Sequence, residues 1–249
     1  MRRVLVFATA VALLVSGCGE DSAAKPTLTV SAAASLKSAF TTCAAQFDQA
    51  TVRFSFAGSD QLAAQIRQGA APNLFASANT RLPDQLHAEG TLEQPQVFST
   101  NTLVIAVPKD SGIASIDDLA RSGTAVVIGD ARVPVGSYTR NVLDQLPAAQ
   151  RTAITANVRS REPDVNGIVG KLTQGAADAG FTYVTDVVGT KGALRAVALP
   201  AALQPTVAYG AGIVTGSGSQ KASQAFLDDV ISGPCRQVMR HAGFGPPPS

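Results

Sequence analysis

Two hydrophobic periods alternate along the chain, and each switch between them marks a change from strand to helix. Residues 27–31 alternate apolar and polar side chains with a period of two, which predicts a strand. In residues 36–47, apolar side chains recur at spacings of three and four, which predicts a helix packed on a core, with Ser35 as its N-cap. A strand at 52–56 and a helix beginning at Ser59 repeat this unit.

The same alternation continues through the rest of the chain. The sequence predicts further strands at 73–78, 102–107, 125–129, 157–160, 180–183 and 206–214, and further helices at 115–121, 137–146, 164–174 and 219–231. Elements of these lengths in this order are typical of an α/β fold with mainly parallel sheets flanked by helices.

We expect two such lobes, with a ligand cleft between them. Lobe I comprises residues 27–106 and 210–249, and lobe II comprises residues 107–209. The predicted strands 102–107 and 206–214 then cross between the lobes and act as hinges.

The N-terminal residues predict export. An apolar run from Val4 to Val15 follows two arginines and is too short to span a bilayer as a helix, so residues 1–17 are typical of a secretory signal peptide. The boundary Val15-Ser16-Gly17-Cys18 resembles a bacterial lipobox, which implies that Cys18 carries lipid and anchors the protein to the outer face of the cell membrane. Residues 18–26 then form a flexible tether. The alternative is an ordinary signal peptide with an incidental cysteine.

Composition excludes some classes of partner. The chain has 249 residues, of which 45% are hydrophobic and 15% are charged, with a net charge of +2. These values suit a compact soluble protein of one large or two ordinary domains. Basic runs and arginine-aromatic interleaving are absent from the sequence, which argues against nucleic acid as a partner.

Two cysteines remain once Cys18 is set aside. Cys43 and Cys235 form an even number in an oxidising compartment, which makes a disulfide between them possible. Zinc ligation is the alternative, but the two cysteines lie far apart in sequence, and His87 and His241 are not at metal-ligand spacing from either.

Catalysis and binding are the two function classes to weigh. A secreted serine hydrolase needs a nucleophile with a base in reach, and the chain has no G-x-S-x-G motif and only two histidines, both on segments that the pattern places at the periphery. Binding rests on four helix starts, at Ser35, Ser59, 135–137 and 164–166. Helix N-termini attract anions, although serine at such a position is also a common structural cap. Both lobes direct these starts toward the carboxyl edges of their strands, where α/β folds bind ligands.

Several segments in both predicted lobes match the motifs of one known family. They are Ala32-Ala33-Ala34-Ser35-Leu36, Phe56-Ala57-Gly58-Ser59, Gln65-Ile66-Arg67-Gln68-Gly69-Ala70, Asn73-Leu74-Phe75-Ala76-Ser77-Ala78, Val133-Pro134-Val135-Gly136-Ser137-Tyr138, Asp164-Val165 and Gly180-Phe181-Thr182-Tyr183. Together they resemble the periplasmic molybdate-binding (ModA) family over essentially the whole mature chain. The resemblance implies the two-lobe, type II periplasmic-binding-protein fold.

The resemblance implies a site and a ligand. Proteins of this family hold the oxyanion with two serines, two backbone amides and a tyrosine hydroxyl, without a basic side chain, a cofactor or a direct protein ligand to bare metal. The matching positions are Ser35, Ser59, Val135, Val165 and Tyr183. Neutral donors fixed by the fold bind a desolvated dianion, and cavity size would then favour molybdate or tungstate over sulfate or phosphate.

The resemblance also implies how the protein works. It would act as a monomer that delivers the oxyanion to an ABC importer, composed of a permease and its ATPase. A binding protein for sulfate or phosphate with the same architecture is the nearest alternative.

Some residues depart from the family pattern. Gly58 and Asp60 replace residues that are often serine, and residues 180–183 replace a more aliphatic sequence. We expect Asp60 to lie in the first turn of the second helix and to face solvent, away from the anion. Three arginines, Arg132, Arg159 and Arg161, flank the predicted loops and are placed outside the site, where they would at most steer anions.

Overall fold

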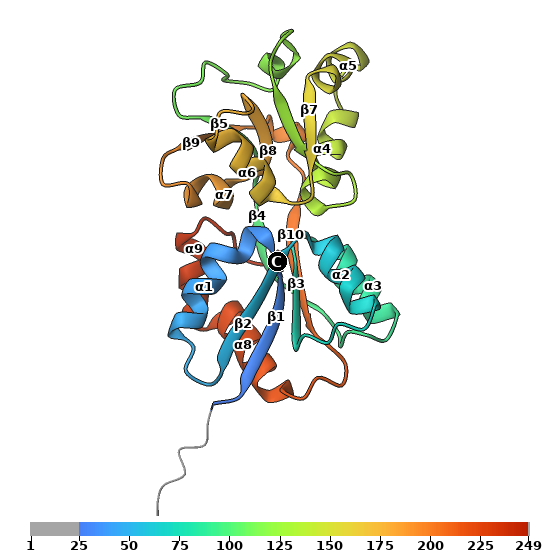
Figure 1. The fold of residues 1–249 in the computed structure, drawn as a ribbon, viewed down its shortest axis with the longest axis vertical. Coiled ribbons are helices and arrows are strands. Elements are labelled where there is room, and N and C mark those ends of the chain that lie inside the picture. Colours follow the sequence, from blue (N-terminus) through green and yellow to red (C-terminus); the bar gives the residue numbers. More distant parts are fainter. Residues whose placement is uncertain (1–24, 249) are drawn as a thin grey trace, which may run out of the picture.

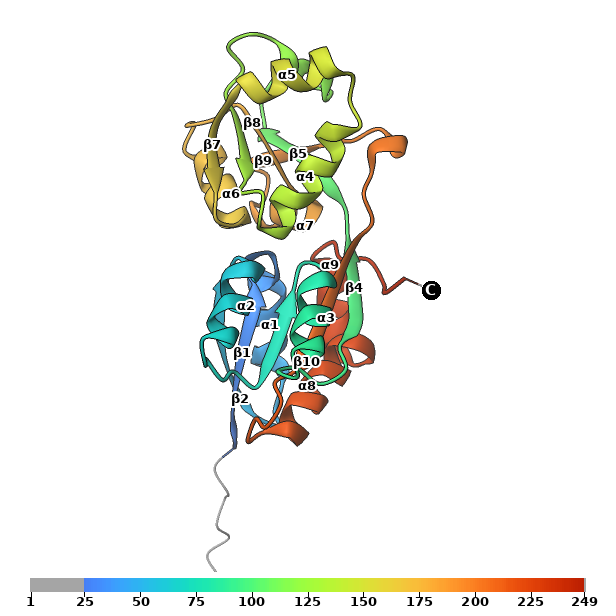
Figure 2. The same cartoon turned by 90° about the vertical axis from the view of Figure 1, so that its right-hand side faces the viewer.

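Two lobes stacked along the long axis make up the protein (Figure 1). The computed structural model describes residues 25–248, and each lobe contains a five-stranded sheet with helices on both faces (Figure 2). The predicted two-lobe α/β architecture is therefore confirmed. The predicted signal peptide, Cys18 and most of the tether lie outside the described residues. Within residues 25–248, no helix has the length and apolar character needed to cross a membrane.

The sheet of lobe I has the strand order β2-β1-β3-β10-β4. Its central strand pairs, β1 with β2 and β1 with β3, are parallel, whereas β10 is antiparallel to both β3 and β4. The strands are β1 (Thr27–Ala33), β2 (Thr51–Ala57), β3 (Leu74–Ser77), β4 (Gln96–Asn101) and β10 (Val207–Ile213).

The sheet of lobe II repeats this arrangement, with the order β7-β6-β8-β5-β9. Here β6 is parallel to β7 and β8, and β5 is antiparallel to β8 and β9. The strands are β5 (Leu103–Pro108), β6 (Val126–Gly129), β7 (Val158–Glu162), β8 (Ala179–Tyr183) and β9 (Leu194–Ala198). The sheets are thus mixed rather than mainly parallel, because each lobe receives an antiparallel strand where the chain crosses into it.

Helices cover both faces of each sheet. Lobe I carries α1 (Lys37–Gln46), α2 (Ser59–Arg67), α3 (Arg81–Ala88), α8 (Gln220–Ser232) and α9 (Pro234–His241). Lobe II carries α4 (Pro134–Asp144), α5 (Ala148–Ala156), α6 (Val165–Thr173) and α7 (Val184–Gly189). Three short 3₁₀ helices are η1 (Ala34–Leu36), η2 (Asp117–Ala120) and η3 (Ala201–Leu203).

Chain direction explains why the site forms between the lobes. In lobe I the chain runs from β1 through α1 to β2, and then returns past β1 through α2 to β3. Right-handed crossovers in opposite directions place α1 and α2 on opposite faces of the sheet. The path from β6 through β7 to β8 does the same in lobe II. The carboxyl ends of both sets of parallel strands therefore face each other between the lobes (Figure 2). This is the edge at which α/β sheets bind ligands.

Both lobe boundaries differ from the expected ones. The strand β5 begins at Leu103 and pairs only within the lobe II sheet, so residues 103–106 belong to lobe II. The strand β10 pairs with β3 and β4 from Val207 onward, so residues 207–209 belong to lobe I. The chain therefore crosses at Thr102 and just before Val207. The strands β5 and β10 therefore each form their backbone hydrogen bonds within one sheet and do not extend into the other lobe.

Several element boundaries also differ from the predicted ones. Ser35 lies inside η1 rather than capping α1, whose N-cap is Leu36. The helix α4 begins at Pro134, three residues before the predicted start, because proline is well suited to the first turn. The predicted helix at 115–121 is only the 3₁₀ turn η2. The short elements β4, β9, α3, α5, α7 and α9 were not predicted.

The core of lobe I contains a pair of packed phenylalanine rings next to a disulfide. The Phe40 ring meets the Phe226 ring edge-on, with 5.7 Å between centroids, and both side chains are fully buried. Next to them, Cys43 of α1 is joined to Cys235 of α9 as a disulfide, with 5.1 Å between the Cα atoms. This bond ties the C-terminal helices to the helix that follows the first site segment.

Candidate oxyanion site

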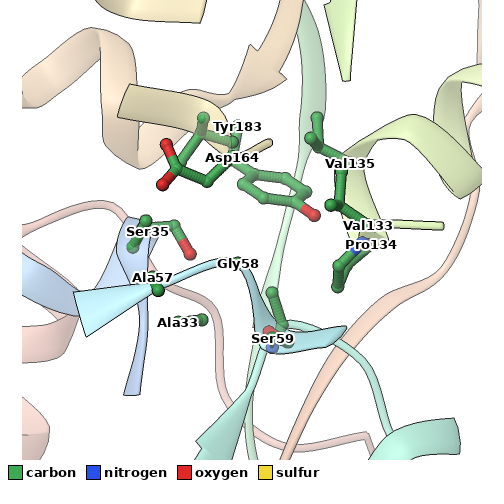
Figure 3. Close-up of a pocket in the computed structure, with 13 residues that line it drawn as sticks. Ala33, Ser35, Ala57, Gly58, Ser59, Val133, Pro134, Val135, Asp164 and Tyr183 are labelled. Carbon is green, nitrogen blue, oxygen red and sulfur yellow. Dashed lines mark hydrogen bonds between the residues drawn. The ribbon is translucent and has the colours of Figure 1, made fainter. Parts of the chain in front are cut away.

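A small cavity lies between the lobes, at the carboxyl ends of their parallel strands (Figure 3). The space inside it that the centre of a water-sized sphere can reach is about 20 Å³, far below the range typical of sites for drug-sized ligands, which favours a small ion. Lobe I contributes Ala33, Ala34, Ser35, Ala57, Gly58, Ser59 and Ala78, and lobe II contributes Val133, Pro134, Val135, Asp164, Val165 and Tyr183. All five predicted oxyanion-binding residues are thus among those that line one cavity.

Two serine hydroxyls face the cavity from lobe I. Ser35 follows β1 in η1 and is 8% exposed, and Ser59 is the first residue of α2 and is 1% exposed. The Ser59 Oγ accepts a hydrogen bond of 3.1 Å from the backbone N–H of Ala78, at the end of β3. Because the oxygen already accepts from this amide, the Ser59 proton is free to donate to a ligand.

Two helix starts face the cavity from lobe II. Val135 is the second residue of α4, and its N–H lies in the first turn, where backbone donors have no intrahelical acceptor. Val165 is the first residue of α6. The Asp164 carboxylate caps that helix by accepting from the N–H groups of Asn166 and Gly167, at 2.8 and 3.2 Å. This cap leaves the Val165 N–H as the remaining first-turn donor.

Tyr183 completes the donor set. Its ring lies between the two lobes and faces the serines (Figure 3). The side chain is 1% exposed, and its hydroxyl has no hydrogen-bond partner within the described residues. Burial raises the pKa of this phenol well above its ordinary value, so the group stays a protonated donor. An unpaired buried hydroxyl costs about 1–3 kcal/mol, and an oxyanion in the cavity would supply the missing acceptor.

The lining of the cavity contains no basic side chain among the described residues. Asp164 is the one acidic residue among those described in the lining, and its carboxylate is oriented by the two capping bonds. A second carboxyl, Asp186, accepts a 2.9 Å bond from the backbone N–H of Tyr183. Burial raises the pKa of Asp186 to about 7, and the nearby charge of Asp164 acts in the same direction. The local positive potential therefore comes from helix starts rather than from cations.

The three arginines singled out in the sequence lie outside this lining. Arg132 is exposed and pairs with Asp130 at 3.0 Å. Arg159 is an exposed residue of β7, and Arg161 lines a separate hollow beside Gly136 of α4.

Asp60 differs from expectation. The residue does lie in the first turn of α2, but its Oδ1 is buried and has no hydrogen-bond partner within the described residues, rather than facing solvent. A Cβ built on Gly58 would lie 2.9 Å from this Oδ1, so the carboxylate folds back over the glycine. The absence of a side chain at Gly58 provides the space for this conformation. Across the cleft, the charge of Asp60 acts on Arg132 of lobe II and contributes to raising the pKa of Arg132, after the larger effect of Asp130.

Two residues behind the site were not found from the sequence. Tyr209 of β10 lies 2.8 Å from Ser35, oxygen to oxygen, and Asn101 at the end of β4 donates to the Tyr209 hydroxyl at 3.2 Å. Both residues lie next to the points where the chain crosses between lobes. No sequence motif marked them, since they become neighbours of Ser35 only through the pairing of β10 with β3 and β4.

Neither histidine belongs to the described lining of the cavity. The Nδ1 of His87 lies 2.9 Å from the carbonyl oxygen of Leu92, and His241 ends α9. Within residues 25–248, no group of three or more His, Cys, Asp or Glu side chains is arranged to hold a metal ion. Among the described residues, no histidine therefore lies with the two serines in the lining of the cavity.

Comparisons with known proteins agree with this geometry. The family model for bacterial extracellular solute-binding proteins matches residues 28–245. The molybdate-binding protein ModA of Mycobacterium tuberculosis is 36% identical, over 98% of this chain and 97% of that protein. Among solved structures, the periplasmic molybdate-binding protein of Azotobacter vinelandii superposes with a TM-score of 0.78 at 20% identity, covering 89% of this chain and all (100%) of that one. The sulfate-binding protein SubI of M. tuberculosis superposes with a TM-score of 0.75 at 17% identity, covering 89% and 87%. The chain therefore belongs to the ModA family of bacterial extracellular solute-binding proteins.

Proposed function

We propose that this protein captures molybdate, and also tungstate, outside the cytoplasm and delivers it to an ABC importer. The observation that carries the proposal is the convergence of five uncharged donors on one small interlobe cavity. Two are serine hydroxyls, two are first-turn amides, and the fifth is the unpaired hydroxyl of Tyr183. The relatives named for molybdate binding support the choice of ligand.

The donor set matches the chemistry of a tetrahedral dianion. Each oxygen of such an ion must exchange its hydration for hydrogen bonds, and bonds to a charged partner contribute about 1.5–3 kcal/mol each. Lobe I supplies donors from Ser35 and Ser59, whereas lobe II supplies them from Val135, Val165 and Tyr183. Because the donors are divided between the lobes, the ligand completes its coordination only when the lobes are closed. Binding and closure are thereby coupled.

Sulfate is the nearest rival ligand, since it offers the same charge and shape at a smaller size. The similarity to the sulfate-binding protein SubI supports a shared fold. Selectivity between the ions must then come from the size and donor positions of the cavity. Fixed donors bind an ion best when its oxygens reach all of them at once, so the larger molybdate and tungstate ions are expected to bind more tightly than sulfate.

The family assignment supports a location outside the cytoplasm. We propose in addition that lipid on Cys18 holds the protein at the outer face of the cell membrane, and that it acts as a monomer on the permease and ATPase of the importer. The first strand, β1, starts at Thr27, shortly after Cys18 in the sequence, so a lipid on Cys18 would be attached close in sequence to lobe I.

Calorimetry of the purified protein with molybdate, tungstate, sulfate and phosphate tests the proposal. We expect one site per chain, with molybdate and tungstate bound at least 10-fold more tightly than the other two ions. A thermal-shift series with the same ions provides an independent readout, because a ligand that binds only the folded state raises its melting temperature by mass action. Preferential binding of sulfate or phosphate would reject molybdate as the ligand, and labelling of Ser35 or Ser59 by a serine-directed fluorophosphonate would revive the hydrolase alternative.

A further inference from the structure

A chain of buried hydrogen bonds runs behind Ser35 and links the two lobes. It consists of Asn101, Tyr209 and Ser35, with a branch to Thr185 of α7. All four residues are at most 8% exposed. Asn101 ends β4 and Tyr209 lies on β10. The series of hydrogen bonds therefore includes a residue from each of the two strands next to the interlobe crossings.

The direction of each hydrogen bond follows from the end at Asn101. The backbone N–H of Thr102 donates to Asn101 Oδ1 at 2.8 Å, which assigns the oxygen and nitrogen of the amide. The amide nitrogen has two protons and no acceptor capacity. It donates one to Thr185 Oγ1 at 2.9 Å and the other to Tyr209 Oη at 3.2 Å.

The hydrogen-bond direction set at Asn101 also determines which way the Ser35 hydroxyl points. Because the Tyr209 oxygen accepts from Asn101, its single proton is directed to Ser35 Oγ at 2.8 Å. The Ser35 oxygen then accepts from Tyr209, so the Ser35 proton points to the remaining neighbour, which is the cavity. The Ser59 oxygen likewise accepts a hydrogen bond, from the backbone N–H of Ala78, so the Ser59 proton also points to the cavity. Both hydroxyls therefore face the ligand as donors.

We propose that Tyr209, oriented by Asn101, is a positioning residue that locks the Ser35 hydroxyl as a donor and so selects fully deprotonated oxyanions over those that carry a proton. This inference rests on the proposed oxyanion-binding function and adds a basis for selectivity that does not depend on size. A protonated oxyanion presents one O–H that needs an acceptor, and a donor facing that proton leaves both groups unpaired. Sites built to match hydrogen-bonding partners in this way discriminate strongly against the wrong pattern.

Sulfate and monohydrogen phosphate make a matched pair of probes. Near pH 8 both are tetrahedral dianions of similar size, and they differ mainly by one proton. Their affinities are measured by competition with molybdate in calorimetry, and the ratio of the phosphate to the sulfate dissociation constant is compared between variants. Effects on stability or lobe closure act on both ions and cancel in this ratio.

Tyr209→Phe frees the Ser35 hydroxyl to rotate and to accept from a ligand proton. We expect molybdate affinity to fall roughly 10-fold and the phosphate-to-sulfate ratio to fall by a similar factor. Asn101→Asp keeps the size but replaces the donor with an acceptor, so Tyr209 donates to Asp and Ser35 must donate to Tyr209. That reversal removes the Ser35 donor, and we expect a larger loss of molybdate affinity with a lowered ratio.

Tyr138→Phe is the control. Tyr138 is a half-buried tyrosine that packs edge-on against Tyr183, with 6.5 Å between ring centroids, and it takes no part in the hydrogen bonds of Ser35. We expect the wild-type ratio in this variant. The proposal would be overturned if Tyr209→Phe and Asn101→Asp both kept the wild-type ratio of the phosphate to the sulfate dissociation constant. It would also be overturned if this ratio fell as far in Tyr138→Phe as in those two variants. Failure of the wild-type protein to bind molybdate instead would count against the proposed function, and the ratio would remain measurable with direct titrations of sulfate and phosphate.

Discussion

Gly58 of lobe I packs directly against the carbonyl oxygen of Pro163 in lobe II. A Cβ built on Gly58 would lie 2.5 Å from this oxygen and 3.5 Å from the Cγ1 of Val133, also in lobe II. The two lobes are therefore in contact at Gly58. A backbone oxygen has little freedom to move aside, so any side chain here opposes closure.

Gly58→Ala is expected to weaken oxyanion binding by about 10-fold or more, since overpacking costs of 1–3 kcal/mol apply only to the closed form. Small-angle X-ray scattering with saturating molybdate should show a larger radius of gyration than for wild type. Gly170→Ala is the matched control, because a Cβ at Gly170 in α6 meets nothing within 4 Å. A Gly58→Ala variant with wild-type affinity and radius would contradict the closure argument.

The donor residues should respond in a fixed order. Ser35→Ala, Ser59→Ala and Tyr183→Phe each remove one hydroxyl donor to a desolvated dianion, and each should weaken molybdate binding about 10- to 150-fold in calorimetry. Circular dichroism should show an unchanged fold.

Three further substitutions serve as controls for that order. Val135→Ala and Val165→Ala retain the backbone donors and should have much smaller effects on affinity. Arg161→Ala should change the association rate and its salt dependence rather than the contacts to the ion, because Arg161 lies outside the cavity lining. Normal binding by both serine variants together with lost binding in Arg161→Ala would mean that a cation holds the ligand.

Asp186 should make stability depend on pH. Its pKa in the folded protein is about 7, above the ordinary value of 3.8, because the carboxyl is buried. The folded state thus holds this proton more tightly than the unfolded state, and the free energy of unfolding should fall as pH rises from about 4 to 7. Asp186→Asn keeps an acceptor for the Tyr183 N–H and removes the titration. Thermal melts should show the variant more stable than wild type near pH 8, and this difference should shrink steadily as the pH falls from about 7 to 4. If the stability of wild type and of Asp186→Asn depended on pH in the same way, Asp186 would not be the group whose pKa is raised.

Loss of the disulfide should lower stability without abolishing binding. The bond spans a sequence separation of 192 residues, for which the chain-entropy model gives an upper value of about 5 kcal/mol. The double variant Cys43→Ser with Cys235→Ser should unfold at a lower denaturant concentration and bind molybdate within about 3-fold of wild type, because α1 and α9 are joined away from the cavity lining. Free-thiol titration of the denatured wild-type protein provides the check, and reactive thiols without reductant would contradict the bond.

The proposed membrane anchor should depend on Cys18. Replacing it in Cys18→Ser should remove the lipid attachment point, so the protein should move from the membrane fraction to the soluble one or accumulate with its signal peptide. Mass spectrometry of the mature wild-type N-terminus identifies the modified residue. A soluble wild-type protein whose mature chain begins elsewhere would reject the anchor.

The sequence by itself determined the local pattern of strands and helices and indicated which residues to propose as oxyanion donors. Period-two and period-3.6 stretches predicted the alternating strands and helices, because side-chain direction follows directly from the backbone repeat. The order of the matching segments identified Ser35, Ser59, Val135, Val165 and Tyr183, which the structure places in the lining of one cavity. Helix N-termini after strands pointed to an anion for the same local reason.

Only the tertiary structure decided which residues act together across the chain. The boundary at Thr102 depends on which sheet receives β5, and local periodicity is the same for either choice. The link from Asn101 through Tyr209 to Ser35 depends on strands far apart in sequence. Hydrogen-bond direction within such a network is a property of its full set of partners, so no single segment of the chain specifies it.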